Sequence, residues 1–453
     1  MVRICLFALA CVLLSVPVSG AEPQRLVLRD SAVFDTTTGK MLPQRTLVIA
    51  GGKITAIGTR EEPATFSDGA RVVDASGKYV IPGLIDAHVH LVHLADRTHV
   101  TGDEFLPLFL AAGVTSVRSA GDAIVAEVGI ARYAALHPEY CPRVFLASPL
   151  IDGERPVHRD VGYSLTDPAL VPAFVDEMSQ WNVVTLKIYV GTPRLIGQKV
   201  IEEGHRRGMI VTGHLGRYTA QEAAADGVDC LEHIWSVFNY SITPEAAQIP
   251  NPRANLDLQN PQCQALIAQL VKQKVAVDPT LVVFRNMIYL NDLEEVQEHE
   301  DLKHVPKRML RYWETYRSSS NLDPQTRPLR LREVEKYQEL TGLLHKAGVT
   351  ILAGTDTPEP FVPPGFSLHQ ELEMLVASGL SPAAALTAAT LNNAAIVQQS
   401  DTLGSLEVGK QADLVVLSAD PTKDIRNTRK IEFVVHGGQV CNPAALLERV
   451  SDE

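Results

Sequence analysis

Two histidines and an aspartate occupy alternate positions of one apolar run, IPGLIDAHVHL at residues 81–91. Alternate side chains of a β-strand face the same side, so Asp86, His88 and His90 are predicted to point together into the interior. Histidines two positions apart near the end of a strand can bind one metal ion together. One buried histidine can be satisfied by a hydrogen bond, but two beside an aspartate are costly to bury without a partner. The run therefore predicts a metal site.

Three further polar residues end other apolar runs. They are His214 in MIVTGHLG, His233 in CLEHIW and Asp356 in VTILAGTD. Each alone is a weak signal, because a lone histidine is often a hydrogen-bonded core residue and an aspartate after a strand is often a helix cap. Since all three end predicted strands, they extend the predicted cluster of metal-binding side chains.

A lysine interrupts the inward face of another strand, VVTLKIYVG at residues 183–191. Leu186 and Ile188 belong to a fully apolar face, so Thr185, Lys187 and Tyr189 are predicted to face the interior. An ammonium group beside metal ions is repelled, so Lys187 must be neutral, displaced or chemically changed. Carboxylation by carbon dioxide would make it an anionic ligand that can bridge two metals. The alternative is a lysine that reaches the mouth of the site to bind a substrate carboxylate.

The elements that must position these residues alternate between short apolar strands and helical stretches. The run at 81–91 is followed by GVTSVRSAG, PRVFLASPL, VVTLKIYVG, MIVTGHLG, DCLEHIW, VAVDPTL and VTILAGTD. Eight strands alternating with helices predict an α/β fold, a (β/α)8 TIM-like barrel over residues 83–399, whose active site lies at the carboxyl ends of the strands. A doubly wound open sheet is the alternative. A charged stretch at 290–346 is predicted to be a helical insertion before the last strand.

Both ends of the chain have a different residue pattern from the middle. Residues 22–82 and 400–453 carry short alternating strands separated by Gly and Asp, which predicts a small composite β-sandwich domain built from both chain ends. Residues 1–21 have one early positive charge, a short apolar core and small residues before Glu22, the pattern of a secretory signal peptide. We therefore expect a periplasmic or secreted protein with no membrane span after signal removal.

Composition excludes some partners. The chain has 41 Lys and Arg against 53 Asp and Glu, a formal net charge of −12, which disfavours binding to nucleic acid. Four cysteines remain after signal removal, at 141, 230, 263 and 441, without C-x-x-C spacing. A disulfide is compatible with an oxidising compartment, but its pairing does not follow from the sequence. A homo-oligomer is equally compatible with the sequence.

The motifs together resemble the amidohydrolase superfamily over nearly the whole mature chain. The matching stretches are VIPGLIDAHVH, GVTSVR, the Lys of LKI, the His of GHLG, the His of LEHI, AGTDT, SPAAALTAATLNNAA and LGSLEVGKQADLVVL. Within the superfamily the chain looks most like hydrolases related to imidazolonepropionase and to Xaa-Pro and other dipeptidases. The resemblance implies a binuclear metal-dependent hydrolase.

The resemblance also implies a role for each ligand. His88 and His90 would hold the more buried metal, a carboxylated Lys187 would bridge, and His214 and His233 would hold the second metal. Asp356 would touch the first metal and serve as the catalytic base. Two divalent ions lower the pKa of a bridging water and polarise a carbonyl, and Asp356 then delivers the proton to the departing nitrogen. Zinc fits His and carboxylate ligands best, with manganese, cobalt and iron as alternatives.

Signals for the substrate are weaker. His158 in RPVHRD, Tyr189 and Arg217 in GHLGRY are candidates for binding a substrate carboxylate or carbonyl, although ordinary solvated loop positions explain each as well. His93 is expected to lie outside the ligand set. We expect hydrolysis of a C–N amide bond of a small peptide or N-acyl amino acid. The alternatives are a hydrolase of a cyclic amide or lactone, and a non-catalytic binding protein on the same scaffold.

Overall fold

The computed structural model describes residues 25–59, 69–288, 299–319 and 323–450. The signal peptide predicted at 1–21 lies outside these residues. The strands, in chain order, are β1 (Leu26–Asp35), β2 (Lys40–Ala50), β3 (Lys53–Thr59), β4 (Arg71–Asp74), β5 (Tyr79–Pro82), β6 (Leu84–Val89), β7 (Val114–Ser119), β8 (Arg143–Phe145), β9 (Leu150–Asp152), β10 (Gly162–Ser164), β11 (Thr185–Ile188), β12 (Ile210–Gly213), β13 (Cys230–Glu232), β14 (Ala276–Asp278), β15 (Leu414–Leu417), β16 (Ile431–His436) and β17 (Gln439–Cys441).

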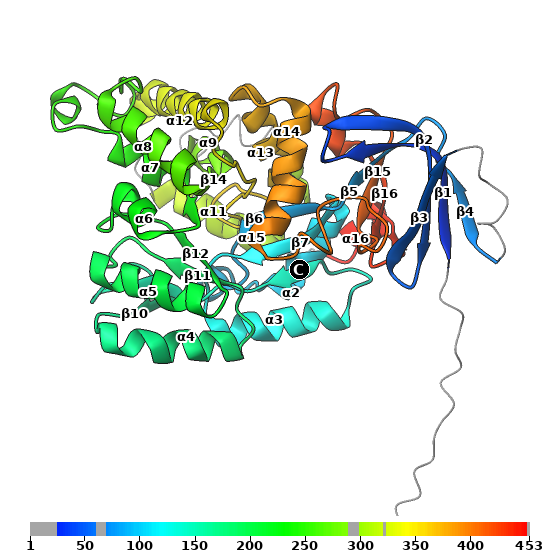
Figure 1. Ribbon diagram of the computed structural model, residues 1–453, viewed down its shortest axis with the longest axis horizontal. Coiled ribbons are helices and arrows are strands. Elements are labelled where there is room, and N and C mark those ends of the chain that lie inside the picture. Colours follow the sequence, from blue (N-terminus) through cyan, green and yellow to red (C-terminus); the bar gives the residue numbers. More distant parts are fainter. Residues whose placement is uncertain (1–24, 60–68, 289–298, 320–322, 451–453) are drawn as a thin grey trace, which may run out of the picture.

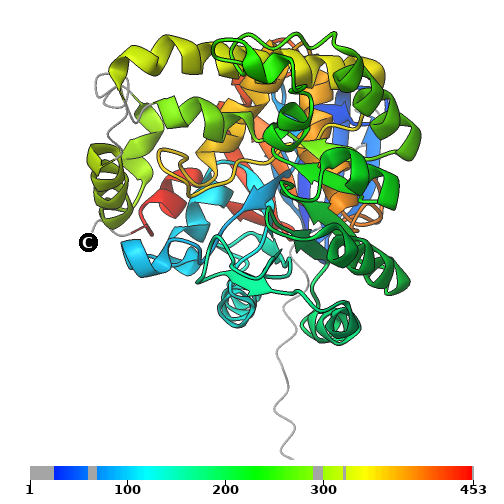
Figure 2. The same cartoon turned by 90° about the vertical axis from the view of Figure 1, so that its left-hand side faces the viewer.

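The helices surround a central group of strands (Figure 2). They are α1 (Ala95–Thr98), α2 (Gly102–Ala111), α3 (Ile124–Leu136), α4 (Val171–Gln180), α5 (Arg194–Arg206), α6 (Ala220–Asp226), α7 (Ile234–Tyr240), α8 (Pro261–Gln273), α9 (Leu281–Asn286), α11 (Lys307–Ser319), α12 (Arg327–Ala347), α13 (Phe366–Ala377), α14 (Pro382–Thr387), α15 (Asn393–Ile396) and α16 (Pro443–Leu447). Helices α11 and α12 fall in the predicted charged insertion. None of the described helices is both long and apolar enough to cross a membrane.

One sheet gathers strands from both ends of the chain. Its order is β17-β16-β15-β5-β1-β2-β3, with β4 also paired to β1, and it lies at one end of the molecule (Figure 1). Alternating residues bury Leu28, Leu47, Val80 and Leu414 in one cluster, as a sheet with one covered face requires. The two chain ends therefore join in one sheet, while the second layer of the predicted sandwich stays a prediction.

The remaining strands are parallel and form two sheets, β6-β7-β8 and β10-β9-β11-β12-β13-β14. Isolated parallel bridges link Ala147 to Thr185, Val277 to Ile351 and Val89 to Thr357. Seven of the eight predicted barrel segments contain a named strand. The eighth, at 349–356, contains no named strand, but Ile351 bridges to Val277 and the Ala353 carbonyl accepts a hydrogen bond from the Ala87 N–H of β6.

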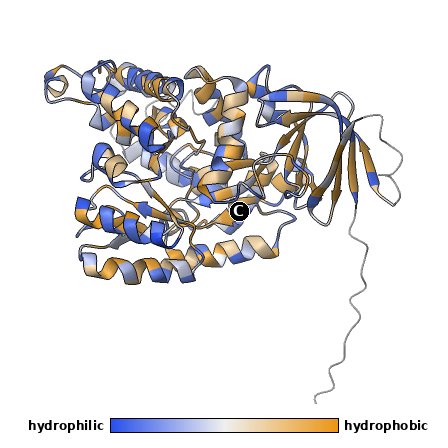
Figure 3. Ribbon diagram, viewed as in Figure 1, coloured by the Kyte–Doolittle hydropathy of each residue, from blue (hydrophilic) through white to orange (hydrophobic). Residues whose placement is uncertain are grey.

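Helix α5 shows how an amphipathic helix packs against the strands. In α5 the residues Ile196, Val200 and Ile201 are buried, whereas Lys199 and Glu202 on the other side form an exposed ion pair. This spacing is that of an amphipathic helix packed on a sheet. Figure 3 shows the result: apolar residues concentrate in the central strands and polar residues on the outer sides of helices such as α4 and α5. The four cysteines at 141, 230, 263 and 441 are buried free thiols.

A buried carboxylate ties the end sheet to the parallel strands. Asp413 accepts a hydrogen bond from the Gly437 backbone N–H at 2.7 Å, lies 3.1 Å from His436 Nδ1 and pairs with Arg143 at the start of β8. Burial would raise the pKa of Asp413, but the bonds from His436 and Gly437 and the charge of Arg143 outweigh it and lower that pKa below 3.8.

We expect Asp413→Asn to lower the free energy of unfolding by about 1–3 kcal/mol at neutral pH, because the neutral amide leaves Arg143 without its buried counter-charge. A carboxylate with a lowered folded pKa stabilises above its unfolded pKa, and the gain is lost as pH falls through the folded value. The deficit of the variant should therefore shrink below pH 3.8. Urea unfolding across this range measures it, and a deficit independent of pH would contradict the assignment.

Candidate active site

The six predicted metal ligands line one small cavity. Its volume is about 50 Å³, and it is enclosed by His88, His90, His93, Leu150, His158, Lys187, Tyr189, His214, His233, Asp356 and Glu359. Two of the three predicted substrate contacts, His158 and Tyr189, lie in the same wall. The third, Arg217, is exposed and outside this cavity, and its backbone N–H donates to the carbonyl of Val190.

Asp356 lies at the centre of the histidines. One carboxylate oxygen is 3.4 Å from His88 Nε2 and 3.2 Å from His90 Nε2, and the other is 3.9 Å from His233 Nδ1. The ring centroids of His214 and His233 are 4.4 Å apart. The backbone φ is 63° at Asp356 and 59° at His233, a left-handed conformation that costs energy for such residues and concentrates at functional sites.

Gly354 allows the segment that carries Asp356 to pass close to His88 on β6. A Cβ atom added to Gly354 would lie 2.6 Å from His88 Cβ and 2.3 Å from an oxygen of Asp278. Only glycine therefore lets the backbone of the AGTD segment pass beside β6. From there the Asp356 N–H donates to the His88 carbonyl at 2.8 Å, which fixes the carboxylate beside the histidines.

The protonation states suit a cation. Burial, followed by the charge of Lys187, lowers the pKa of His214 to about 3, and burial lowers the pKa of His88 and His233 well below 6.5. Neutral imidazole is the form that binds metal. His90 differs: burial lowers its pKa, but Asp122 and Asp356 outweigh burial and raise it to about 10. These carboxylates therefore stabilise positive charge in the cavity.

Several buried nitrogens around the cavity have no hydrogen-bond partner among the described residues, His88 Nε2 and Lys187 Nζ among them. Leaving such groups unpaired is costly, and each one in a folded protein needs an explanation. His88, His233 and Asp356 also place ligand atoms within 4.8 Å of one another. Nitrogen and carboxylate donors at this spacing fit a divalent metal ion.

A second set of charged residues supports the histidines from behind. Glu232 accepts a hydrogen bond from His88 Nδ1 at 2.8 Å and pairs with Arg118 at 2.6 Å. This fixes the ring so that Nε2 faces the cavity. The hydroxyl of Thr280 lies 2.7 Å from His233 Nδ1. Asp278 is buried beside Glu232, and burial raises its pKa well above the usual value.

Sequence reasoning missed these supporting residues. Arg118, Glu232 and Asp278 stand inside the quoted stretches GVTSVR, CLEHIW and VAVDPTL, and all three are fully buried. A charged residue within an apolar strand was the available signal. His93 also lies closer to the candidate ligands than expected, because it lines the same cavity; its Nε2 is 3.3 Å from Glu359.

A family comparison decides the assignment. The model of the Amidohydrolase family matches residues 79–441, most of the chain. This chain belongs to the amidohydrolase family. The resemblance inferred from the motifs is thus confirmed, and members of this family typically bind divalent metals.

The relatives of this amidohydrolase include an imidazolonepropionase and an adenine deaminase. The imidazolonepropionase of Herpetosiphon aurantiacus is 25% identical over 438 residues, covering 88% of this chain and 90% of the relative. The adenine deaminase of Ruegeria pomeroyi is 25% identical over 206 residues, covering 43% of this chain. That match spans only 32% of the deaminase, so the chain corresponds to about a third of its length.

The amidohydrolase is also similar to solved structures. A Xaa-Pro dipeptidase with bound methionine superimposes with a TM-score of 0.69 at 19% identity, covering 92% of this chain and 100% of that chain. At this identity the likeness concerns the fold. Together with the family, it implies a TIM-barrel-like fold for the mixed α/β structure.

The stability of this amidohydrolase is expected to depend on the Arg118–Glu232 ion pair. We expect Arg118→Met to lower the free energy of unfolding by about 3–5 kcal/mol, because Glu232 is then buried without its strongest cation. Denaturant unfolding measures the loss. Arg194→Met is the matched control, since Arg194 pairs with Asp226 at the surface and such pairs contribute about 1 kcal/mol or less. Equal effects of the two variants would contradict the role of Arg118.

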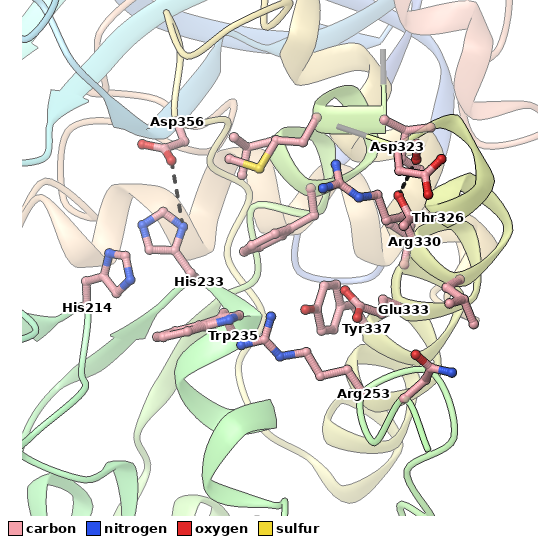
Figure 4. A pocket seen from close by; sticks show the side chains of 17 residues that line it. His214, His233, Trp235, Arg253, Asp323, Thr326, Arg330, Glu333, Tyr337 and Asp356 are labelled. Carbon is pink, nitrogen blue, oxygen red and sulfur yellow. Dashed lines mark hydrogen bonds and ion pairs between the residues drawn. The ribbon is translucent and has the colours of Figure 1, made fainter. Parts of the chain in front are cut away.

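A larger cavity opens beside the ligand cluster. Its volume is about 710 Å³, and His214, His233 and Asp356 belong to its wall as well as to that of the small cavity. Figure 4 shows these three residues on one side and the helix α12 residues Arg330, Glu333 and Tyr337 on the other. A volume of several hundred cubic ångströms is that of a small-molecule site.

Proposed function

We propose that this amidohydrolase is a binuclear metal-dependent hydrolase that cleaves the C–N amide bond of a small peptide or N-acyl amino acid. The observation that carries the proposal is the gathering of His88, His90, Lys187, His214, His233 and Asp356 around one cavity next to a substrate-sized one. Family membership supports hydrolase chemistry on C–N bonds.

The donor set suggests how two divalent ions would be held. His88 and His90 would hold one ion, His214 and His233 the other, with Asp356 on the first and Lys187, as a carbamate formed with carbon dioxide, between them. Burial lowers the pKa of Lys187, so a larger fraction of its amine is neutral and able to react with carbon dioxide. We propose zinc, because it accepts imidazole and carboxylate ligands together.

When bound, such ions supply an electrophile for the carbonyl and a water of lowered pKa. The chain supplies the proton transfers. Burial raises the pKa of Asp356, so this carboxylate takes a proton more readily than an exposed aspartate. It accepts the proton of the attacking water and delivers it to the amide nitrogen, which must be protonated to leave. His158 and Tyr189 would orient the substrate carbonyl or carboxylate.

The finer features of the fold and location are part of the proposal. The three isolated parallel bridges support a closed (β/α)8 barrel, because they link the two parallel sheets to each other and to the 349–356 segment. The apolar stretch and small residues at 1–21 support export to the periplasm or the exterior. Fractionation of cells that make the full chain tests the location.

The first test is a substrate panel for the zinc-loaded protein. It contains Xaa-Pro, Xaa-Arg, Xaa-Lys and apolar dipeptides and N-acyl amino acids, with release of the free amino acid as the readout and the metal-stripped protein as control. Metal-dependent release supports the proposal. Activity confined to cyclic amides or lactones would replace it. A protein that binds no metal after zinc reconstitution would instead be a binding protein on the same scaffold.

A further inference from the structure

The larger cavity contains two arginines that no described residue neutralises through an ion pair. Arg253 and Arg330 both belong to its wall, and across the described residues neither forms an ion pair or a side-chain hydrogen bond. Both are only partly exposed. In Figure 4 their side chains extend from the far wall towards the side where His233 and Asp356 lie. Unpaired guanidinium groups in a cavity are ready donors for a carboxylate.

Glu333, a carboxylate in the same wall, forms no ion pair with either arginine. Glu333 lies close enough to both arginines to feel their charge, yet burial outweighs them and raises the pKa of Glu333. Asp323 is exposed, and its side chain accepts the Gln325 backbone N–H at 2.9 Å, which caps its own turn. Of the three carboxylates in the wall, Asp356 belongs to the candidate ligand cluster, Asp323 caps its own turn and Glu333 is half-buried.

Aromatic side chains connect the arginines to the ligand cluster. The Trp235 ring lies 5.9 Å from His214 on one side and 5.8 Å from the Arg253 guanidinium carbon on the other. Phe284 lies 6.3 Å from His233 and 5.0 Å from Tyr337. These faces form a continuous apolar path from the candidate metal ligands to the positive charge. A flat apolar group can pack along it.

We propose that this cavity binds an amino acid with an aromatic side chain, whose ring packs between Trp235 and Phe284 and whose carboxylate is bound by Arg253 and Arg330. This rests on the proposed amide hydrolysis and names its substrate class: N-acyl aromatic amino acids and dipeptides that end in one. Water adds to the acyl carbon, the C–N bond breaks, and the amine takes the proton. The products are a carboxylic acid and a free aromatic amino acid.

Acetate release from three substrates tests the class. N-acetylphenylalanine has the ring and the carboxylate, N-acetylphenylalaninamide lacks the charge, and N-acetylglycine lacks the ring. We expect kcat/KM for the first to exceed that for the other two by about 10-fold or more, since a charged hydrogen bond and the burial of an aromatic ring each contribute about that much. Equal values for all three would overturn the inference.

The arginines are tested by R253Q, R330Q and the double variant. We expect the double variant to lower kcat/KM for N-acetylphenylalanine by about 30- to 100-fold and to leave N-acetylphenylalaninamide within about 3-fold. R332Q is the matched control, because Arg332 is on the same helix but pairs with Glu335 at the surface. A loss shared by both substrates would show a structural role and contradict carboxylate recognition.

A binding measurement separates this inference from the proposed hydrolysis. The probe is 3-phenylpropionate, which has the ring and the carboxylate but no amide bond. Calorimetry should detect binding by the wild-type protein and by R332Q, and at least about 10-fold weaker binding by the double variant. If no amide is cleaved but this pattern holds, the hydrolase proposal fails and the cavity assignment stands. If amides are cleaved and the probe binds all variants equally, the cavity assignment fails alone.

Discussion

Replacing Asp356 by Asn should lower kcat by about 10²- to 10⁴-fold, the range that loss of a general acid–base group produces. The amide cannot accept the proton of the attacking water or return it to the leaving nitrogen. Asn should keep the local structure, because it tolerates the left-handed conformation that Asp356 adopts and retains the backbone bond to His88. Turnover should therefore fall much more than metal content.

Two measurements on the same preparation decide this prediction. Steady-state turnover of the best substrate gives kcat, and elemental analysis gives metal per chain. Asp401→Asn is the control, because Asp401 is an exposed aspartate far along the sequence from the cluster. Full activity in the Asp356 variant would remove it from the catalytic role. If the variant loses all of its metal together with its activity, Asp356 is a metal ligand and this change does not test its proton transfer. Asp356→Glu keeps the carboxylate, and it would then have to restore turnover.

Replacing Lys187 by Ala should abolish occupancy of two metals and lower kcat by about 100-fold or more, since loss of even a supporting residue of a metal site costs 10- to 100-fold. Lys187 is buried, its Nζ has no hydrogen bond, and its nearest acidic atom is Glu232 Oε1 at 3.9 Å. The proposed carbamate would give this nitrogen its partner, and alanine cannot form one.

Metal content per chain is the direct readout for Lys187. Lys199→Ala is the matched control, because Lys199 pairs with Glu202 on the surface of α5. We expect two ions in the control and at most one in Lys187→Ala. Unchanged occupancy by two ions in the latter variant would remove Lys187 from the site and favour the alternative, a lysine that contacts the substrate.

The gathering of the candidate ligands in one cavity could be predicted from the sequence because each member obeys a local rule. His88 and His90 follow the two-residue period of a strand, and His214, His233 and Asp356 each end an apolar run. Parallel strands then bring these ends together, as the shared cavity confirms. The pairing of both chain ends in one sheet could also be predicted, because both ends alternate apolar and polar residues in a pattern that the middle of the chain lacks.

The supporting network and the large cavity could not be predicted in this way. Arg118 and Glu232 are 114 positions apart, and only the packed structure shows that their charges meet. Beyond the candidate ligands, the wall of the larger cavity combines residues of α7, the loop before α8, α9 and α12, and their sequences carry no signal for a ligand. The eighth segment contains no named strand, and the close passage of Gly354 by His88 could not be predicted from that segment alone, because His88 lies far from it in the sequence.

The composite sheet has a consequence for the order in which the protein is made. Strand β5 pairs with β1 at only two positions but with β15 along its whole length, from Tyr79 to Pro82. Its partner lies more than three hundred residues further along the chain. During synthesis the edge of β5 therefore stays open until β15 emerges, long after the parallel strands are available to fold. An open strand edge is a template for wrong pairing. A nascent chain stalled before β15 should be the aggregation-prone species.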